Sequence, residues 1–295
     1  MTGSVRGAAT AVLLACSPGA VLADQSLDLR IEANFTSDNN VTRARTAGDK
    51  LSDRSFGLTV TKGFEFAIPD SANTRVVASA FLGREQFQNY HGLSRYFAGG
   101  QGEFQYRAAG DFGTPIFAAF VRSSMDQYDS TLRDGYRNSV GVSVRKSVTD
   151  RIDAFGALAW NKRDGKSAVF DDKDYSARLN VDYSLTRNGT VYLSGEYRKG
   201  DVVSTARPGL SSLDIASAIV RDDVFTDTAR TSYRIDARTV LATLGYNQAF
   251  SHGQAVDISW RMVRSTPTAS PGFTGPGTSD SYYVNQLSLS YLVQF

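Results

Sequence analysis

Apolar and polar residues alternate along much of this chain. In 174–185, for example, Leu179 and Val181 alternate with Arg178 and Asn180. A period of two places the two kinds of residue on opposite faces of an extended strand. The pattern therefore predicts strands that each present one apolar face and one polar face.

The alternation, in a clear or a mixed form, marks twelve segments. They are 26–36, 55–66, 75–87, 95–107, 115–126, 137–147, 151–163, 174–185, 190–200, 231–249, 255–265 and 281–295. In 231–249 the phase changes, because Tyr233 and Ile235 share one face whereas Val240 and Leu244 share the other. A β-bulge near Arg238 would reconcile the two halves.

The polar face carries full charges on strand after strand, and the apolar face is aromatic at its ends. A membrane barrel explains both, because its outer face meets lipid and its inner face meets water or a polar plug. After residue 23 no stretch approaches the roughly 18 consecutive apolar residues that a membrane-spanning helix requires. The expected fold is all-β, a closed antiparallel transmembrane β-barrel of about 12 strands.

Short and long connections alternate between the expected strands. The short ones lie near 69–70, 110–111, 149–150, 187–189 and 252–253, and the long ones span about 37–54, 88–94, 127–136, 164–173, 201–230 and 266–280. Short periplasmic turns and longer outside loops are typical of outer-membrane barrels. An even number of strands then places both ends of the barrel in the periplasm.

Residues 1–23 have the features of a secretory signal peptide. Arg6 supplies the positive charge, 8–15 is a short apolar stretch, and the small residues up to Ala23 suit cleavage. We therefore expect two parts, a signal peptide at 1–23 and an outer-membrane β-barrel domain at 24–295.

Cys16, the single cysteine, leaves an alternative open. The stretch 13–16 loosely resembles a lipoprotein processing site, and lipidation at Cys16 would anchor the chain through a lipid. Cleavage after Ala23 would instead leave a mature chain without cysteine and without a disulfide.

The last segment has apolar residues at every second position and stops on an aromatic residue. The positions are Leu289, Tyr291, Val293 and Phe295. This pattern resembles the C-terminal assembly signal of Gram-negative outer-membrane β-barrel proteins. The resemblance implies a porin-like protein of the bacterial outer membrane. Its partners would be the barrel assembly machinery during insertion, and then outer-membrane lipid and lipopolysaccharide.

The stretch from Asp38 to Arg43, directly after the first segment, resembles openings seen in large exported barrels. Among these are the surface-lipoprotein assembly modifiers. The sequence shows no counterpart of the helical periplasmic repeat domain that is typical of those modifiers. The resemblance therefore concerns their barrel part alone.

Charge argues against a nucleic-acid partner. The chain has 32 basic and 30 acidic residues, so the charges nearly cancel. No strong basic face of the kind that binds a phosphate backbone is implied.

The chain has two histidines, and each is a candidate catalytic group. His91 lies three positions before Ser94 in a short outside loop, which invites a Ser–His interpretation, but no third group is evident that would orient the base. His252 lies in a Ser-His-Gly-Gln turn and fits turn chemistry. We therefore expect that the chain is not an enzyme and that it binds no cofactor.

We also expect no metal site. No His/Cys cluster exists in the sequence. Asp171, Asp172 and Asp174 crowd one outside loop, and Asp222, Asp223 and Asp227 crowd another. Such oxygen clusters can bind calcium, but solvated acidic loops are the commoner explanation.

The polar face of the strands supplies the candidate functional residues, which would line the lumen. They are Arg30, Glu32, Asn34, Arg178, Asn180, Asp182, Glu196, Arg198, Asp236, Arg238, Asp257 and Arg261. In a narrow barrel their opposite charges would pair into a network, whereas in a wetter barrel they would set the selectivity of a pore. The outward aromatic residues Tyr183, Tyr197, Tyr233, Trp260, Tyr291 and Phe295 would form girdles at the membrane surfaces.

Three functions follow from this architecture. The first is a narrow channel for small polar solutes, with loop 201–230 as a candidate constriction because its apolar segment 213–220 could fold inward or pack as a short helix. An exposed loop with a local turn is the alternative for this segment. The second is a non-conducting binding or assembly scaffold, whose outside loops would contact a surface partner or an exported protein. The third is a lipid-modifying enzyme near His91.

Overall fold

The computed structural model describes residues 28–68, 71, 73–108, 111–207, 213–225, 229–251, 253–269 and 281–295. The expected signal peptide and Cys16 lie outside these residues. In the described part of the chain, no helix is long and apolar enough to cross a membrane.

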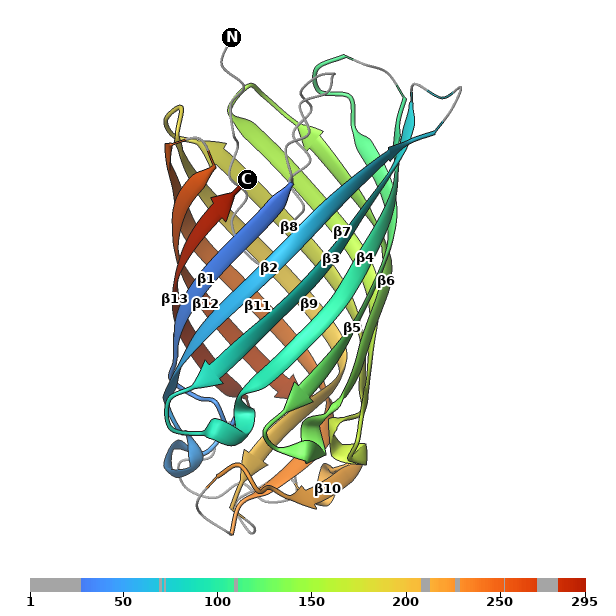
Figure 1. Ribbon diagram of the computed structural model, residues 1–295. Helices are drawn as coiled ribbons and strands as arrows, with labels where there is room; N and C mark the ends of the chain where they lie inside the picture. The colour runs from blue at the N-terminus through green and yellow to red at the C-terminus, as the bar shows by residue number, and fades with distance from the viewer. Residues whose placement is uncertain are drawn as a thin grey trace.

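Twelve strands form a closed antiparallel barrel, and a short additional strand, β10, pairs with one of them (Figure 1). The ring closes where β1 pairs with β13 and where β9 pairs with β11. The strands are β1 (Leu29–Asp38), β2 (Asp53–Ala67), β3 (Thr74–Phe87), β4 (Arg95–Arg107), β5 (Ile116–Tyr128), β6 (Gly135–Ser147), β7 (Ile152–Gly165), β8 (Asp172–Ser184), β9 (Gly189–Ala206), β10 (Ala218–Arg221), β11 (Thr231–Ser251), β12 (Gln254–Pro267) and β13 (Tyr282–Gln294).

Each of the twelve segments expected from the sequence coincides with a barrel strand, so the predicted fold class is confirmed. The largest difference is at β9, which continues to Ala206 rather than ending near residue 200. β9 and β11 pair over their whole shared length and so extend further than the other strands. Within loop 201–230, residues 213–215 form a 3-10 turn and Ala218–Arg221 form β10, not a single helix.

The predicted bulge near Arg238 is wrong. β11 pairs with β9 without interruption across this region, and its register shift lies between Ala249 and Ser251. Tyr233 and Ile235 are 1% and 2% exposed, because Ala206 and the segment 213–216 pack against them. Along β11 the apolar residues therefore lie on the inward face at Tyr233 and Ile235 and on the outward face from Val240, although the strand has no bulge between them. For the same reason Tyr233 is not part of an outward aromatic girdle.

One face of the wall is apolar and exposed. Leu158, Leu179 and Leu193 are 60%, 59% and 58% exposed, and they lie on the same side of the adjacent strands β7, β8 and β9. A continuous apolar surface of this size is unfavourable in water but suits the hydrocarbon core of a membrane. The apolar face is therefore the outer, lipid-facing side of the barrel.

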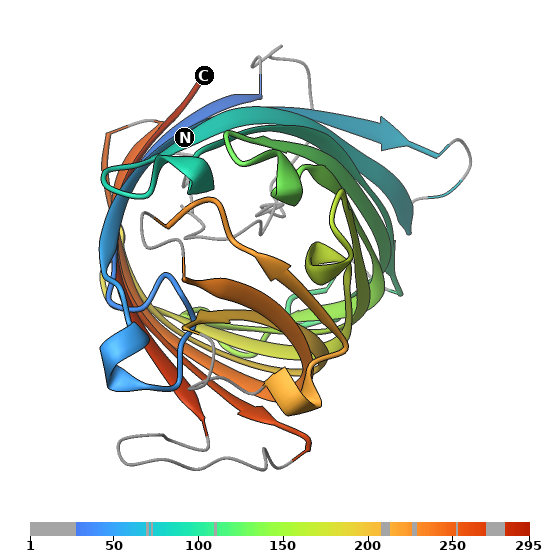
Figure 2. The same cartoon turned by 90° about the horizontal axis from the view of Figure 1, so that it is seen from below.

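The two ends of the barrel differ. The start of β1 and the end of β13 lie at one end, where the described turns are short, and this is the periplasmic end (Figure 1). The other end carries five 3-10 turns in its loops: η1 (Ala47–Asp49), η2 (His91–Leu93), η3 (Thr131–Arg133), η4 (Ala168–Phe170) and η5 (Leu213–Ile215). Seen from this outer end, β10 lies across part of the opening (Figure 2).

Candidate functional site

The polar side of the wall faces the lumen. Arg122 of β5 interacts electrostatically with Arg178 of β8, and Arg178 interacts with Arg261 of β12. Side chains from strands so far apart in the ring approach one another only across the inside of the barrel. Ten of the twelve predicted lumen residues occupy this set of alternate positions: Arg30, Glu32, Asn34, Arg178, Asn180, Asp182, Glu196, Arg198, Asp257 and Arg261.

Asp236 and Arg238 differ from the prediction. Both side chains are exposed and share the outward side of β11 with Val240 and Leu244. Both positions pair with outward residues of β9, since Asp236 lies opposite Asp201 and Arg238 lies opposite Lys199. The uninterrupted register of β11 leaves them outside.

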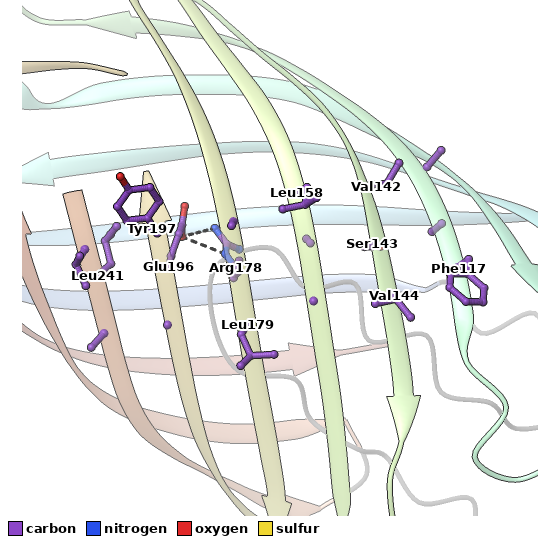
Figure 3. Close-up of a pocket in the computed structure, with 18 of the residues that line it drawn as sticks. Phe117, Val142, Ser143, Val144, Leu158, Arg178, Leu179, Glu196, Tyr197 and Leu241 are labelled. Atoms are coloured by element: carbon purple, nitrogen blue, oxygen red, sulfur yellow. Dashed lines mark hydrogen bonds and ion pairs between the residues drawn. The ribbon is translucent and has the colours of Figure 1, made fainter. Parts of the chain in front are cut away.

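Glu196 holds two arginines on neighbouring strands. Its carboxylate accepts from Arg178 Nη2 at 2.8 Å and from Arg198 Nε at 2.6 Å. Figure 3 shows the Arg178–Glu196 interaction between adjacent strands. The Glu196 side chain is 9% exposed, whereas Arg178 and Arg198 are 31% and 41% exposed. The two positive groups therefore remain open to water while the carboxylate is largely covered.

Two further arginines face the same level of the lumen. Arg122 stacks on the ring of Phe81 with its guanidinium 4.6 Å from the ring centroid, and Arg261 donates a long 3.4 Å hydrogen bond to Thr243. Among the described residues neither has a carboxylate within ion-pair distance. We name the following four residues the arginine collar: Arg122, Arg178, Arg198 and Arg261.

The predicted lumen residues of β1 lie nearer the periplasmic end. Arg30 Nη2 lies 3.7 Å from Glu32, and the side-chain amide of Asn34 donates to Ser290 Oγ at 2.8 Å. These contacts link β1 to itself and to β13, so they stabilise the seam of the barrel.

Asn180 and Asp182 of β8 and Asp257 of β12 also lie toward the periplasmic end, on other parts of the wall. The amide of Asn180 donates to Asp182 at 2.7 Å, and the hydroxyl of Tyr192 donates to Asp257 at 3.1 Å. A Cβ at Gly245 would overlap the ring of Tyr192. Glycine at this position therefore allows the tyrosine to lie flat against β11 and reach Asp257.

A group of lumen residues was missed by the sequence analysis. Asp126 accepts from Arg95 Nη1 at 3.1 Å and pairs with Arg137, and the hydroxyl of Tyr128 accepts from Arg137 at 2.8 Å. The signal was present, because Asp126 and Tyr128 continue the inward alternation of β5. The mixed pattern of 115–126 obscured it.

The outer mouth carries a second buried polar cluster, in the segment 213–225, which we name the outer cap. Asp222 accepts from Arg133 Nη2 at 2.6 Å, from the hydroxyl of Ser232 and from the N–H of Val224 at 3.0 Å. Burial alone would raise the pKa of Asp222. The charge of Arg133 and these hydrogen bonds outweigh it and hold the pKa below its usual value.

The outer cap and its flanks also contact other outer loops. The rings of Phe225 and Tyr90 lie 5.1 Å apart, which joins the cap to the loop after β3. Asp49, in the loop after β1, accepts from Arg207 Nε at 2.8 Å and from Arg230 Nη1 at 3.3 Å. The hairpin of β9 and β11 is thereby tied across the mouth to loops on both sides.

The structure gives the Ser–His hypothesis little support. His91 is exposed, and the buried hydroxyl of Ser94 accepts from the backbone N–H of Phe87 at 3.0 Å. No hydrogen bond joins the His91 side chain to Ser94, both of which the structure describes. His252 lies outside the described residues.

The aspartate clusters also have other contacts. Asp171 Oδ1 accepts from the N–H of Gly165 at 2.7 Å, and Asp222 is held by Arg133 as described above. In the described part of the chain, no group of three His, Cys, Asp or Glu residues is arranged to hold a metal ion. Asp227 lies outside the described residues.

A hollow of about 1000 Å³ lies against the wall formed by strands β4 to β9 and β11. Most of its lining side chains belong to the apolar outward set, including Phe117, Val142, Leu158 and Leu179 (Figure 3). The hollow therefore belongs to the lipid-facing side, and it is not a solute site of the lumen.

No model of a known protein family matches the sequence, and no curated protein matches it. The structure is similar to solved bacterial proteins. An outer-membrane channel from Pseudomonas putida F1 matches with a TM-score of 0.52 and 13% identity, over 94% of this chain and 100% of that chain. The chain has the fold of an outer-membrane β-barrel.

Two porins are also similar to this outer-membrane β-barrel, with lower scores. The NanC porin matches with a TM-score of 0.47 and 8% identity, over 90% of this chain and 100% of that chain. The KdgM porin, solved in complex with disordered oligogalacturonate, matches with a TM-score of 0.44 and 10% identity, over 90% and 99%. At such identities the likeness concerns the fold alone. Together with the apolar outer face, this fold confirms the expected porin-like architecture and outer-membrane location.

The last strand of the outer-membrane β-barrel presents the predicted assembly residues on one side. Leu289, Tyr291 and Phe295 are 50%, 43% and 56% exposed, and Val293 shares their alternation. They lie on the lipid-facing side of β13. Their recognition by the barrel assembly machinery stays a prediction.

Proposed function

We propose that this barrel is a narrow channel for small polar solutes. The observation that supports it most strongly is the water-accessible polar interior. Arg30, Arg178 and Arg198 face the lumen and keep 27%, 31% and 41% of their side-chain surface exposed. Charged groups in a plugged interior would be paired and dry, because an uncompensated buried charge is costly.

The size of the ring is consistent with this function. Barrels of about eight strands are filled by their own side chains, and those of about sixteen leave a wide aqueous channel. A ring of twelve strands lies between these cases. β10 lies across part of the outer opening, which is consistent with the constriction expected of loop 201–230 (Figure 2). Small solutes are therefore the expected cargo.

Planar bilayer recording tests the proposal. Refolded protein should produce uniform, small conductance steps, and protein denatured by heat before addition should produce none. Correctly folded barrel that never conducts would overturn the channel. A partner that co-purifies with such a barrel would then support the scaffold. For either function, the barrel assembly machinery, outer-membrane lipid and lipopolysaccharide are the expected partners.

A further inference from the structure

We infer that the arginine collar is a binding site for oxyanions, so that the channel selects small solutes that carry a carboxylate or phosphate group. This inference deepens the proposed channel function and rests on it. The site is formed by inward-facing residues of β5, β8, β9 and β12.

The charges of the collar are not balanced by its own carboxylates. Glu196 pairs with Arg178 and Arg198 and interacts electrostatically with Arg261, so one carboxylate faces three guanidinium groups. Asp126 interacts with Arg122, but Arg95 and Arg137 already pair with it. Asp172 and Asp174 interact electrostatically with Arg198, but Asp172 also faces Arg163 and Arg137, which add further positive charge. The middle of the lumen therefore has an excess of positive charge.

Two members of the collar have hydrogen-bond donors that the described residues leave unused. A guanidinium group has five N–H donors in a planar fork that matches an oxyanion. The guanidinium carbon of Arg122 lies over the ring of Phe81, and no hydrogen bond or ion pair joins this side chain to the described residues. Among the described residues, the side chain of Arg261 makes a single hydrogen bond, which is the long one to Thr243. Both arginines can donate hydrogen bonds to a carboxylate or phosphate group without breaking an ion pair with a described residue.

The arrangement places these donors on opposite sides of the path. β5 and β12 are six strands apart in the ring of twelve, and both Arg122 and Arg261 interact electrostatically with Arg178. A solute that crosses this level passes between them. Its anionic group is within the combined field of the collar wherever it lies in the cross-section.

The lumen uses arginine rather than lysine, and this choice supports the binding of oxyanions rather than a general preference of the channel for anions. On the described barrel strands, every cationic side chain of the inward set is an arginine. The lysines of these strands, in contrast, occupy the outward set: Lys62, Lys146, Lys162, Lys173 and Lys199. Arginine binds carboxylate and phosphate through two parallel hydrogen bonds, which lysine cannot do.

Reversal potentials in a potassium chloride gradient test the selectivity. The native channel should favour the anion, and Arg122→Gln combined with Arg261→Gln should bring the anion-to-cation permeability ratio severalfold down toward one. Arg84→Gln is the control, because it makes the same kind of substitution on the outward side of β3. A cation-selective native channel, or equal selectivity in the double variant and the native protein, would overturn the inference.

Citrate binding separates this inference from the channel proposal. Isothermal titration of the detergent-purified barrel at low ionic strength should detect citrate binding that the double variant loses and Arg84→Gln keeps. Binding without conductance would support the site and refute the channel. Conductance without binding or anion preference would refute the site and leave the channel standing.

Discussion

Arg133 and Asp222 of the outer cap pair where water hardly reaches, with side chains 7% and 0% exposed. In the arginine collar, Arg178 and Arg198 pair with Glu196 but remain 31% and 41% exposed. The residue types and the distances are similar in the two regions. Exposure separates them, because a buried pair loses its solvation and depends on its partner, whereas an exposed pair is screened.

Because of this difference in exposure, the cap and the collar have different roles. The cap pair fixes a segment of chain across the mouth, and removal of one partner would strand a buried charge. The collar arginines keep donors free for a passing solute. A substitution in the cap should therefore change the local structure, and a substitution in the collar should change permeation.

The largest expected effect is that of Arg133→Met. The change leaves Asp222 charged, buried and unpaired, which costs about 3–5 kcal/mol. Native-state hydrogen exchange should show this loss in the amides of 222–225 and little change in the barrel strands. The double variant Arg133→Met with Asp222→Asn should lose less, because no buried charge is left. Equal losses in the single and double variants would contradict the dependence on charge.

A smaller effect is expected on the two sides of β8, and it tests which way the wall faces. Leu179→Arg places a charge in the lipid and should destabilise the barrel by about 2–4 kcal/mol. Asn180→Arg, one position further, places it in the lumen and should change the free energy of unfolding much less. Unfolding by urea in lipid vesicles measures both. Similar losses for the two variants would refute the assignment of faces.

The smallest expected effect is that of mild acid on the cap. The pKa of Asp222 is lowered in the folded state, so its stabilising contribution is complete above the ordinary carboxyl value of about 4 and is lost only as the pH falls through the lower folded value. Exchange protection at Val224, corrected for intrinsic rates, should be constant from about pH 8 to 5. A loss of protection near pH 6 would show that the pKa of Asp222 is not lowered.

The strands of the barrel could be predicted because their signal is local. A period of two needs only neighbouring residues, and the lipid-facing side of β8 shows it clearly through Leu179 and Val181. The prediction failed on β11, where Tyr233 and Ile235 are apolar but face inward. They are covered there by a loop, so their hydrophobicity reports burial under protein rather than contact with lipid.

The candidate site was predictable only in part. Arg178, Glu196, Arg198 and Arg261 lie on clearly alternating strands, whereas Arg122 lies in a mixed segment and was missed. The cap could not be predicted at all. Its ion pair joins residues 89 positions apart, and no local pattern specifies which outer loop reaches which.

The seam between β1 and β13 has a consequence for the order of synthesis. It joins Arg30 with Gln294 and Asp38 with Gln286, and the N–H of Phe295 donates to Leu29 at 2.9 Å. The ring therefore cannot close before β13 has been synthesised. Until then one edge of β1 has unpaired backbone N–H and C=O groups, which can pair with a strand of another chain. A nascent chain of this kind has to be kept extended and escorted to the membrane before its two ends find each other.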